Sequence, residues 1–295
     1  NYKDYVLPMM FVKYLSDSYT DAVEELSKQY AGIRLERQKK YLPFMVAEGC
    51  SFYDLYQQRF ADNIGQLMNA AMRQIEADNN QQLAGVLSAV DYNSENALGT
   101  REHKNAILRD LLEDFEPLDL RPSAIEVKEG QVPADVIGDA YEYMIGQFAS
   151  MAGKKAGSFY TPAAVSEIMA RIVDVQPGER VYDPTCGSGS LLIKAAKKQN
   201  SKEVSIYGQE VNGSSVAMAK MNMYIHEIRD AKIGWGDTLA NPMFLDADGN
   251  LLLFDAIVAN MPFSKDKWAS GFNPGGESSG KGKKEFKMEA SLDKF

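Results

Sequence analysis

Residues 180–198 contain the stretch that most restricts how this chain can fold. Arg180 to Tyr182 is a short apolar run that ends in Asp183, a loop of small residues with two glycines follows, and 191–198 has the composition of a helix. This order predicts a strand, a tight turn and a helix N-terminus, the junction at which α/β sheets bind nucleotide-like ligands. Glycine allows the backbone to approach such a ligand closely, because no Cβ stands in between.

The loop differs from a dinucleotide-binding loop. The Rossmann fingerprint G-x-G-x-x-G requires a third glycine where this chain has Leu192, and an Asp-Pro pair precedes the loop. A ligand without a pyrophosphate therefore fits better. The arrangement acid-x-x-x-Gly-x-Gly resembles motif I of S-adenosylmethionine-dependent methyltransferases, although a purely structural glycine-rich turn explains these residues about equally well when they are taken alone.

Length and composition limit the class of protein. With 295 residues, 45% hydrophobic and 25% charged, the chain has the composition of a soluble globular protein with room for two domains. No apolar run is long enough to span a bilayer, and no signal-peptide pattern opens the chain. The two cysteines, Cys50 and Cys186, lie far apart and form no metal-ligand spacing, so a reduced, cytoplasmic setting without a metal site is expected.

The charge balance bears on possible partners. A net charge of −9 is not typical of a free-standing nucleic-acid binder, so a DNA substrate would require a local basic face or a basic partner. The chain begins at Asn1 rather than at a methionine, and we expect the fragment to start inside a longer protein.

Residues 1–135 predict an all-α domain with no visible chemistry. Apolar residues recur at helical spacing from Tyr5 to Leu15, with Pro8 in the first turn or just before the helix, and a second helical run is expected over 17–30. The many aromatic and methionine side chains near the start fit an ordinary core better than a docking surface for another subunit. Further helices are expected over 55–75, 81–90 and 103–115, the first introduced by Ser51-x-x-Asp54. The short apolar segment at 41–46 is compatible with an extended conformation.

A second motif precedes the strand–loop–helix stretch. Ser158-Phe159-Tyr160-Thr161-Pro162 leads into a helix predicted over 163–173. Thr161 is expected to be its N-cap and Pro162 its first residue. Phe159 and Tyr160 would then lie just outside a helix N-terminus, which suits a carboxylate.

The two motifs together resemble those of a known family. Gly-x-Phe-Tyr-Thr-Pro, followed after a short helix by Asp-Pro-x-x-Gly-Ser-Gly-Ser-Leu, is similar to the modification (methyltransferase) subunits of type I restriction-modification systems, and so is the segment from Gly138 to Tyr143. The resemblance covers most of the chain, the helical half more weakly. It implies an α/β fold in which a helical domain (1–135) precedes a Rossmann-like S-adenosylmethionine-dependent methyltransferase domain (136–295).

The resemblance also implies ligands and partners. The cofactor would be S-adenosylmethionine, the substrate DNA, and the partners a specificity subunit and a restriction (nuclease) subunit, with two copies of this chain in each complex and no membrane involved.

Only four strong strands are visible, ending near 183, 210, 235 and 260, so we expect the chain to stop inside its catalytic domain. His103 and His226 are expected to lie at the surface or to be hydrogen-bonded.

The expected cofactor-binding residues lie in the loops that follow these strands. Glu210 ends its strand about twenty residues beyond the glycine loop, where α/β sites place the carboxylate that accepts from ribose hydroxyls; a solvated strand-end acid is the alternative. By resemblance Asp237 would approach the adenine of the cofactor, whereas Ser188 could equally be a small turn residue. The full predicted set is Ser158, Phe159, Tyr160, Thr161, Pro162, Asp183, Gly187, Ser188, Gly189, Glu210 and Asp237.

Residues 255–260 predict a buried strand that runs into Met261-Pro262-Phe263. The family has Asn-Pro-Pro-Phe or Asn-Pro-Pro-Tyr here, the motif that holds the base being methylated, which implies Asn260, Pro262 and Phe263 as catalytic residues. The Asn260 side-chain oxygen and a neighbouring carbonyl can accept both N–H groups of an exocyclic amine, and Phe263 offers a face for a flipped base. Met261 replaces the first proline and loses its fixed φ, with an expected effect on rate; a plain strand-to-loop turn is the alternative.

Three functions compete. The leading one is a DNA methyltransferase subunit directed at adenine, because Asn260 and Phe263 favour adenine over cytosine amines and no Pro-Cys pair is present for attack on a pyrimidine ring. The second is an amine methyltransferase that acts on RNA or on protein glutamine. The third is a scaffold of the same fold with weak or no turnover. The Gly/Ser-rich, basic segment 271–284 is expected to be a mobile loop, with phosphate contact as the alternative.

Overall fold

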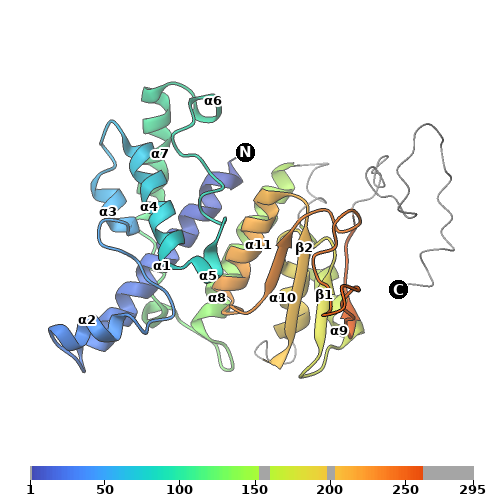
Figure 1. Cartoon of the computed structure of the whole chain (residues 1–295). Helices are drawn as coiled ribbons and strands as arrows, with labels where there is room; N and C mark the ends of the chain where they lie inside the picture. Colours follow the sequence, from blue (N-terminus) through green and yellow to red (C-terminus); the bar gives the residue numbers. More distant parts are fainter. Residues whose placement is uncertain (1, 153–159, 198–202, 262–295) are drawn as a thin grey trace. The chain divides into compact units, whose positions relative to one another are not determined.

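The computed structural model describes residues 2–152, 160–197 and 203–261 (Figure 1). All of them belong to one compact unit, Asn1–Ser264. Helices build its first part, and a parallel sheet with helices builds its second, which confirms the expected fold class. Within the described ranges, no helix is both long and apolar enough to cross a membrane.

The sheet has four parallel strands in the order β3-β2-β1-β4. β1 lies at the centre and pairs with β2 from Arg180↔Ser205 to Asp183↔Gly208, and with β4 at Val181↔Ala256. All of these pairings are parallel, so the carboxyl ends of the four strands share one edge of the sheet. The elements are β1 (Arg180–Asp183), α10 (Ser190–Lys197), β2 (Ser205–Glu210), α11 (Gly213–Ile225), β3 (Lys232–Trp235) and β4 (Ala256–Ile257).

β4 departs from the sequence prediction. It has two residues rather than six, and Ile257 is 57% exposed, because β4 is the last strand of the sheet in the described chain. The ladder continues only as far as Val258, whose N–H donates to the carbonyl of Tyr182 at 2.9 Å. Asn260 therefore follows the sheet in an irregular segment.

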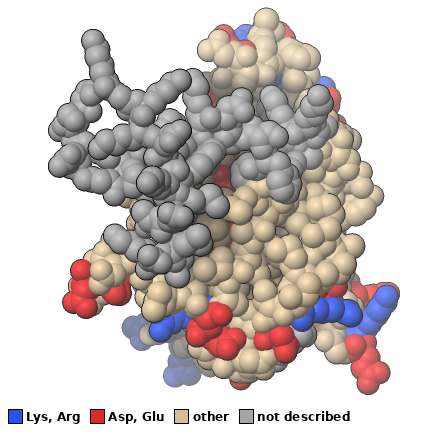
Figure 2. All heavy atoms as spheres, turned by 90° about the vertical axis from the view of Figure 1, so that its right-hand side faces the viewer, with Lys and Arg blue, Asp and Glu red and all other residues tan. Residues whose placement is uncertain are grey.

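The face beside this strand is mostly uncharged. Helix α9 (Ala163–Val173), whose bounds match the prediction, packs on α10 and exposes Val165, Ile168 and Ile172. Figure 2 views the molecule from this side, and the charged side chains of its described surface lie mainly along the lower rim, with a few at the upper rim. The described part of this face therefore presents no broad cationic surface.

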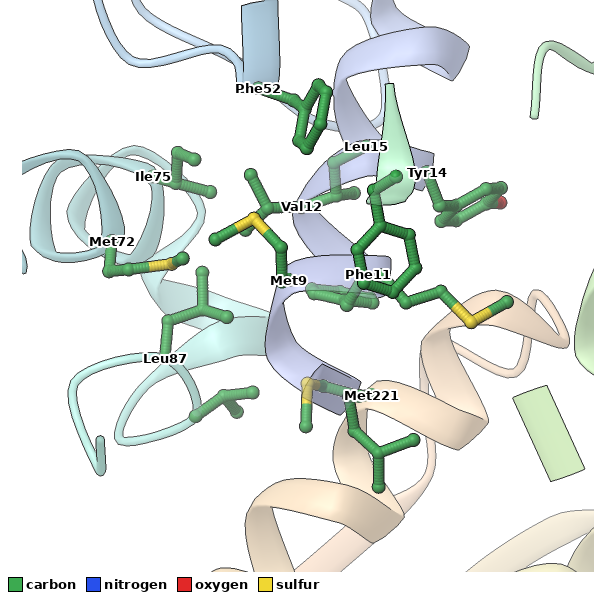
Figure 3. Packing of buried hydrophobic residues seen from close by; sticks show 14 of the residues in the cluster. Met9, Phe11, Val12, Tyr14, Leu15, Phe52, Met72, Ile75, Leu87 and Met221 are labelled. Atoms are coloured by element: carbon green, nitrogen blue, oxygen red, sulfur yellow. The ribbon is translucent and has the colours of Figure 1, made fainter. Parts of the chain in front are cut away.

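In the helical part, α1 (Lys3–Ser27) is surrounded by other elements. Every residue from Leu7 to Ser18 is buried, and Figure 3 shows Met9 beside Met72, with Met221 of another helix close by. We expected two helical runs and Pro8 within the first turn, but one continuous helix begins at Lys3 and contains Pro8 in its interior. Burial on both sides of Pro8 offsets the cost of about 3 kcal/mol that an interior proline carries.

Among the remaining helices, α7 (Arg101–Phe115) confirms the helix expected over 103–115, whereas others differ from the prediction. A capping box at Ser51 and Asp54 opens α3, as expected, but α3 and α4 are separate, and no strand forms at 41–46. Over 81–90 only a short helix forms, because Glu76 accepts the N–H groups of Gly85, Leu87 and Ser88. These elements are α2 (Ile33–Lys39), α3 (Phe52–Gln57), α4 (Ile64–Asp78), α5 (Asn80–Leu83), α6 (Glu95–Leu98), α7 (Arg101–Phe115) and η1 (Pro122–Ala124).

Helix α11 joins the two hydrophobic cores. Its Met218 and Met221 belong to the core of the helical part, while Ala219 and Met223 belong to the core under the sheet. Helix α8 (Pro133–Ala152) also contributes Tyr141 to the first core. The division of the chain at 135/136 stays a prediction.

Charged groups connect α8 to the sheet part. Asp135 pairs with Lys197 at 2.6 Å, and Glu142 pairs with Lys194 at 3.2 Å. His226, which caps the C-terminus of α11, lies against the same face of α8, with its Nε2 4.0 Å from Glu142 Oε1. Its side chain is fully buried and neither ring nitrogen has a hydrogen-bond partner among the described residues, so the expectation for His226 was wrong.

Candidate active site

The predicted site residues gather where the strands end. Asp183 ends β1, Glu210 ends β2, Asp237 follows β3 and Asn260 follows β4. Because the four strands are parallel and adjacent, these residues lie along one edge of the sheet. The glycine loop and the Asn260 segment follow neighbouring strands, as a shared ligand site requires.

The glycine loop is fixed to the end of β2. The N–H of Gly187 donates to Glu210 Oε2 at 3.0 Å, and the N–H of Asn212 donates to Glu210 Oε1 at 2.8 Å. Gly187 and Gly189 have φ of 52° and 76°, values that favour glycine. Each oxygen of Glu210 still has a lone pair for a hydroxyl donor.

Asp183 is a buried acid at the start of the same loop. It is 2% exposed, and its Oδ1 accepts the N–H of Thr185 at 2.9 Å. Burial, with a smaller contribution from the charge of Glu210, raises the pKa of Asp183 to about 7. A positively charged ligand beside it would favour the ionised form.

This pKa predicts a pH-dependent stability. Below about pH 4 Asp183 is protonated in the folded and unfolded chain, whereas between about pH 4 and 7 ionisation favours the unfolded chain. Relative to an Asp183→Asn variant, the ligand-free wild type should therefore lose free energy of unfolding as the pH rises through this window, by roughly 4 kcal/mol at most. Urea unfolding of both proteins at pH 5 and pH 8 measures the difference.

Asp246 provides a control whose contribution to stability should change with pH in the opposite direction. The carboxyl of Asp246 accepts backbone N–H groups in an exposed turn, which lowers its pKa. Wild type should therefore gain stability relative to Asp246→Asn as the pH rises through the acidic range. A difference between wild type and Asp183→Asn that does not change with pH would contradict the assignment of Asp183.

Two residues that the sequence analysis missed also hold these loops. Asn222, fully buried in α11, donates from Nδ2 to the carbonyl of Ser188 at 3.0 Å. Thr238 donates from its hydroxyl to the carbonyl of Pro184 at 2.5 Å. A polar residue between Met221 and Met223 in a helix buried on all sides was the available signal for Asn222.

Ser188 and Asp237 have local partners. Ser188 is 2% exposed and its hydroxyl lies 3.0 Å from that of Ser190. Asp237 Oδ1 accepts the N–H groups of Leu239 and Ala240 at 2.9 and 3.2 Å. Both side chains thus stabilise turns beside the loop, and a ligand contact by either one stays a prediction.

The segment before α9 differs from the prediction. Pro162, not Thr161, is the N-cap, and its carbonyl accepts the N–H groups of Val165 and Ser166. The Thr161 hydroxyl instead accepts from Asn260 Nδ2 at 3.2 Å, so this segment meets the end of β4. The Tyr160 ring packs against α8, where a Cβ on Gly146 would lie 3.1 Å from its hydroxyl oxygen. Ser158, Phe159, Pro262 and Phe263 lie outside the described residues.

The side chains present suit a cationic ligand with hydroxyl groups. Asp183, Glu210 and Asp237 are acids, and in the described chain none of the predicted site residues carries a positive charge. No group of three potential metal ligands occurs among the described residues. S-Adenosylmethionine, with its sulfonium, ammonium and ribose groups, fits this set of residues better than a phosphate-bearing cofactor.

Family models match both parts of the chain. The N-6 DNA methylase model matches residues 132–291, and the HsdM N-terminal domain model matches residues 1–115. These matches agree with the order of parts seen in the structure.

Individual relatives indicate the same family as these models. The type I restriction enzyme MjaVIII methylase subunit of Methanocaldococcus jannaschii is 30% identical over 88% of this chain and 45% of its own length. The MpnII methylase subunit of Mycoplasma pneumoniae is 36% identical over 59% of this chain and 33% of its own. The crystal structure of a type I restriction-modification methyltransferase subunit from Streptococcus thermophilus has a TM-score of 0.66 at 26% identity, over 88% of this chain and 58% of its own. The chain spans about half the length of the curated relatives it matches.

Proposed function

The chain belongs to the N-6 DNA methylase family, and on that premise we propose that it forms part of the modification subunit of a type I restriction-modification system. The proposed reaction transfers a methyl group to the exocyclic N6 amine of an adenine flipped out of DNA. The observation that carries the proposal is the placement of Asn260 beside the glycine loop, at the ends of neighbouring strands. The division into domains 1–135 and 136–295 is proposed with it.

S-Adenosylmethionine would supply an activated methyl group when bound. Glu210 would accept from its ribose hydroxyls, and ionised Asp183 would stabilise its positive charge. The glycines allow close approach of the backbone. The other proposed cofactor residues are Ser158, Phe159, Tyr160, Thr161, Pro162, Gly187, Ser188, Gly189 and Asp237.

Asn260 would act on the target amine. An exocyclic amine delocalises its lone pair into the ring and is a poor nucleophile. Acceptance of its N–H groups by Asn260 Oδ1 and a neighbouring carbonyl would localise that lone pair and stabilise the charge that develops during transfer. Pro262 would shape this loop, and Phe263 would stack on the flipped base, a contact worth roughly 1–3 kcal/mol.

The partners are proposed from the family and from charge. A chain with a net charge of −9 is poorly suited to hold DNA phosphates by itself, and the described part of the face seen in Figure 2 adds no broad cationic surface. We therefore assign most of the DNA contact, and the recognition of sequence, to a specificity subunit. A nuclease subunit and a second copy of this chain complete the proposed assembly, in the cytoplasm.

Transfer of a tritiated methyl group tests the proposal. The full-length protein, co-expressed with its specificity subunit, should label DNA on adenine N6 and should label it far less without that subunit. Label only on RNA or on protein would contradict the substrate. Absence of all label, with the heat of S-adenosylmethionine binding preserved in calorimetry, would contradict the enzymatic role.

A further inference from the structure

Asn260 is held by a side chain from a distant segment. Its Nδ2 donates to Thr161 Oγ1 at 3.2 Å, across 99 positions in the sequence. The Thr161 hydroxyl is available for this bond because Pro162, and not Thr161, caps α9. Thr161, in the segment expected to bind the cofactor, thus contacts Asn260, the residue expected to bind the target base.

The backbone does little to fix Asn260. The β ladder ends at Val258, and within the described residues the bond to Thr161 is the single hydrogen bond that the Asn260 side chain makes. The next residue, Met261, is 61% exposed and has no ring to restrict its φ, as a proline would. The position of the Asn260 carboxamide therefore depends on Thr161.

The direction of the hydrogen bond between Asn260 and Thr161 determines which end of the Asn260 carboxamide stays free. A carboxamide has a donor end and an acceptor end. When Nδ2 is engaged with Thr161, Oδ1 is left as the free end, and Oδ1 is the atom that the transfer reaction requires.

We propose that Thr161 is a positioning residue, which holds the Asn260 carboxamide so that Oδ1 faces the target amine. This inference rests on the proposed function. It gives Thr161 a role beyond contact with the cofactor, and it connects the segment before α9 to the methyl-transfer step.

The test compares Thr161→Val with Thr161→Ser in the full-length protein with its specificity subunit. Valine keeps the β-branched shape without the hydroxyl, and serine keeps the hydroxyl. Thr161→Val should lower kcat by about 10- to 100-fold, because small misplacements of reacting groups cost rates of this order. This loss of kcat should persist at saturating S-adenosylmethionine, beyond any change in the cofactor Kd, and Thr161→Ser should restore most of kcat.

Two kinetic outcomes would overturn the inference. Full activity of Thr161→Val would show that the hydroxyl is dispensable. A rise in the cofactor Kd that accounts for the whole loss of rate would show that Thr161 acts on the cofactor alone.

A second measurement does not depend on turnover. In protein labelled with 15N-asparagine, the Asn260 side-chain NH2 signals, assigned by their loss in Asn260→Ala, should shift in Thr161→Val and not in Thr161→Ser. Unchanged signals in Thr161→Val would overturn the contact. A wild type that methylates no DNA would contradict the proposed function, and the NMR comparison would still decide whether Thr161 holds Asn260.

Discussion

Asn260→Ala in the full-length protein should lower methyl transfer to adenine by at least about 100- to 1,000-fold, the cost of losing one oriented partner of the reacting group. The Kd for S-adenosylmethionine should stay within about two-fold, because Asn260 is not among the proposed cofactor contacts. The loss should appear in kcat rather than in KM for the cofactor. Single-turnover transfer with saturating cofactor measures it directly.

Asn250→Ala is the matched control. Asn250 lies in an exposed turn of the same segment, where its Nδ2 is 3.5 Å from Asp246 Oδ2. This variant should transfer methyl groups at the wild-type rate. Equal loss of rate and of cofactor affinity in Asn260→Ala would contradict the role given to Asn260, since it would place this side chain in the cofactor site.

The sheet and its loops could be predicted because their signals are local. The run that ends in Asp183, the small-residue loop and the following helix are contiguous, and parallel pairing then forces Glu210 and Asn260 to the same edge. Parallel pairing was therefore enough to predict that these loops share one edge, whereas the order of strands within the sheet is seen only in the structure. The helical half offered no such rule, and there some of the expected helix ends were wrong, as at Pro8, although the start at Ser51 and the end at Phe115 were correct.

The contacts that complete the site could not be predicted, because each depends on packing between distant elements. Thr161 reads as an N-cap from its neighbours, yet it bonds to Asn260 because Pro162 takes the capping position. Asn222 looks like one more residue of a helix until that helix is known to lie under the Ser188 loop. His226 was expected to be exposed or hydrogen-bonded, since nothing in the sequence places it against α8.

The buried position of His226 predicts a second large effect, a loss of stability in the variant Gly138→Ala. A Cβ added to Gly138 in α8 would lie 2.1 Å from Cε1 and 2.4 Å from Nδ1 of the His226 ring. The ring is fully buried and has little room to move, and burial lowers its pKa to about 3, so it is neutral at physiological pH. Gly138→Ala should therefore destabilise the protein by about 2–3 kcal/mol, the usual cost of overpacking a core.

Chemical denaturation of Gly138→Ala, with Gly146→Ala as control, measures this effect. Gly146 lies in the same helix, but its added Cβ would meet only the partly exposed Tyr160 side chain, at 3.1 Å from the hydroxyl oxygen and 3.3 Å from Cζ. That variant should change stability by less than about 1 kcal/mol, because alanine favours the helix by a similar amount. His226→Ala should recover part of the loss in the Gly138→Ala background, since it removes the ring that the new methyl group meets. A Gly138→Ala protein as stable as wild type would mean that α8 and the C-terminus of α11 do not pack in this way in solution.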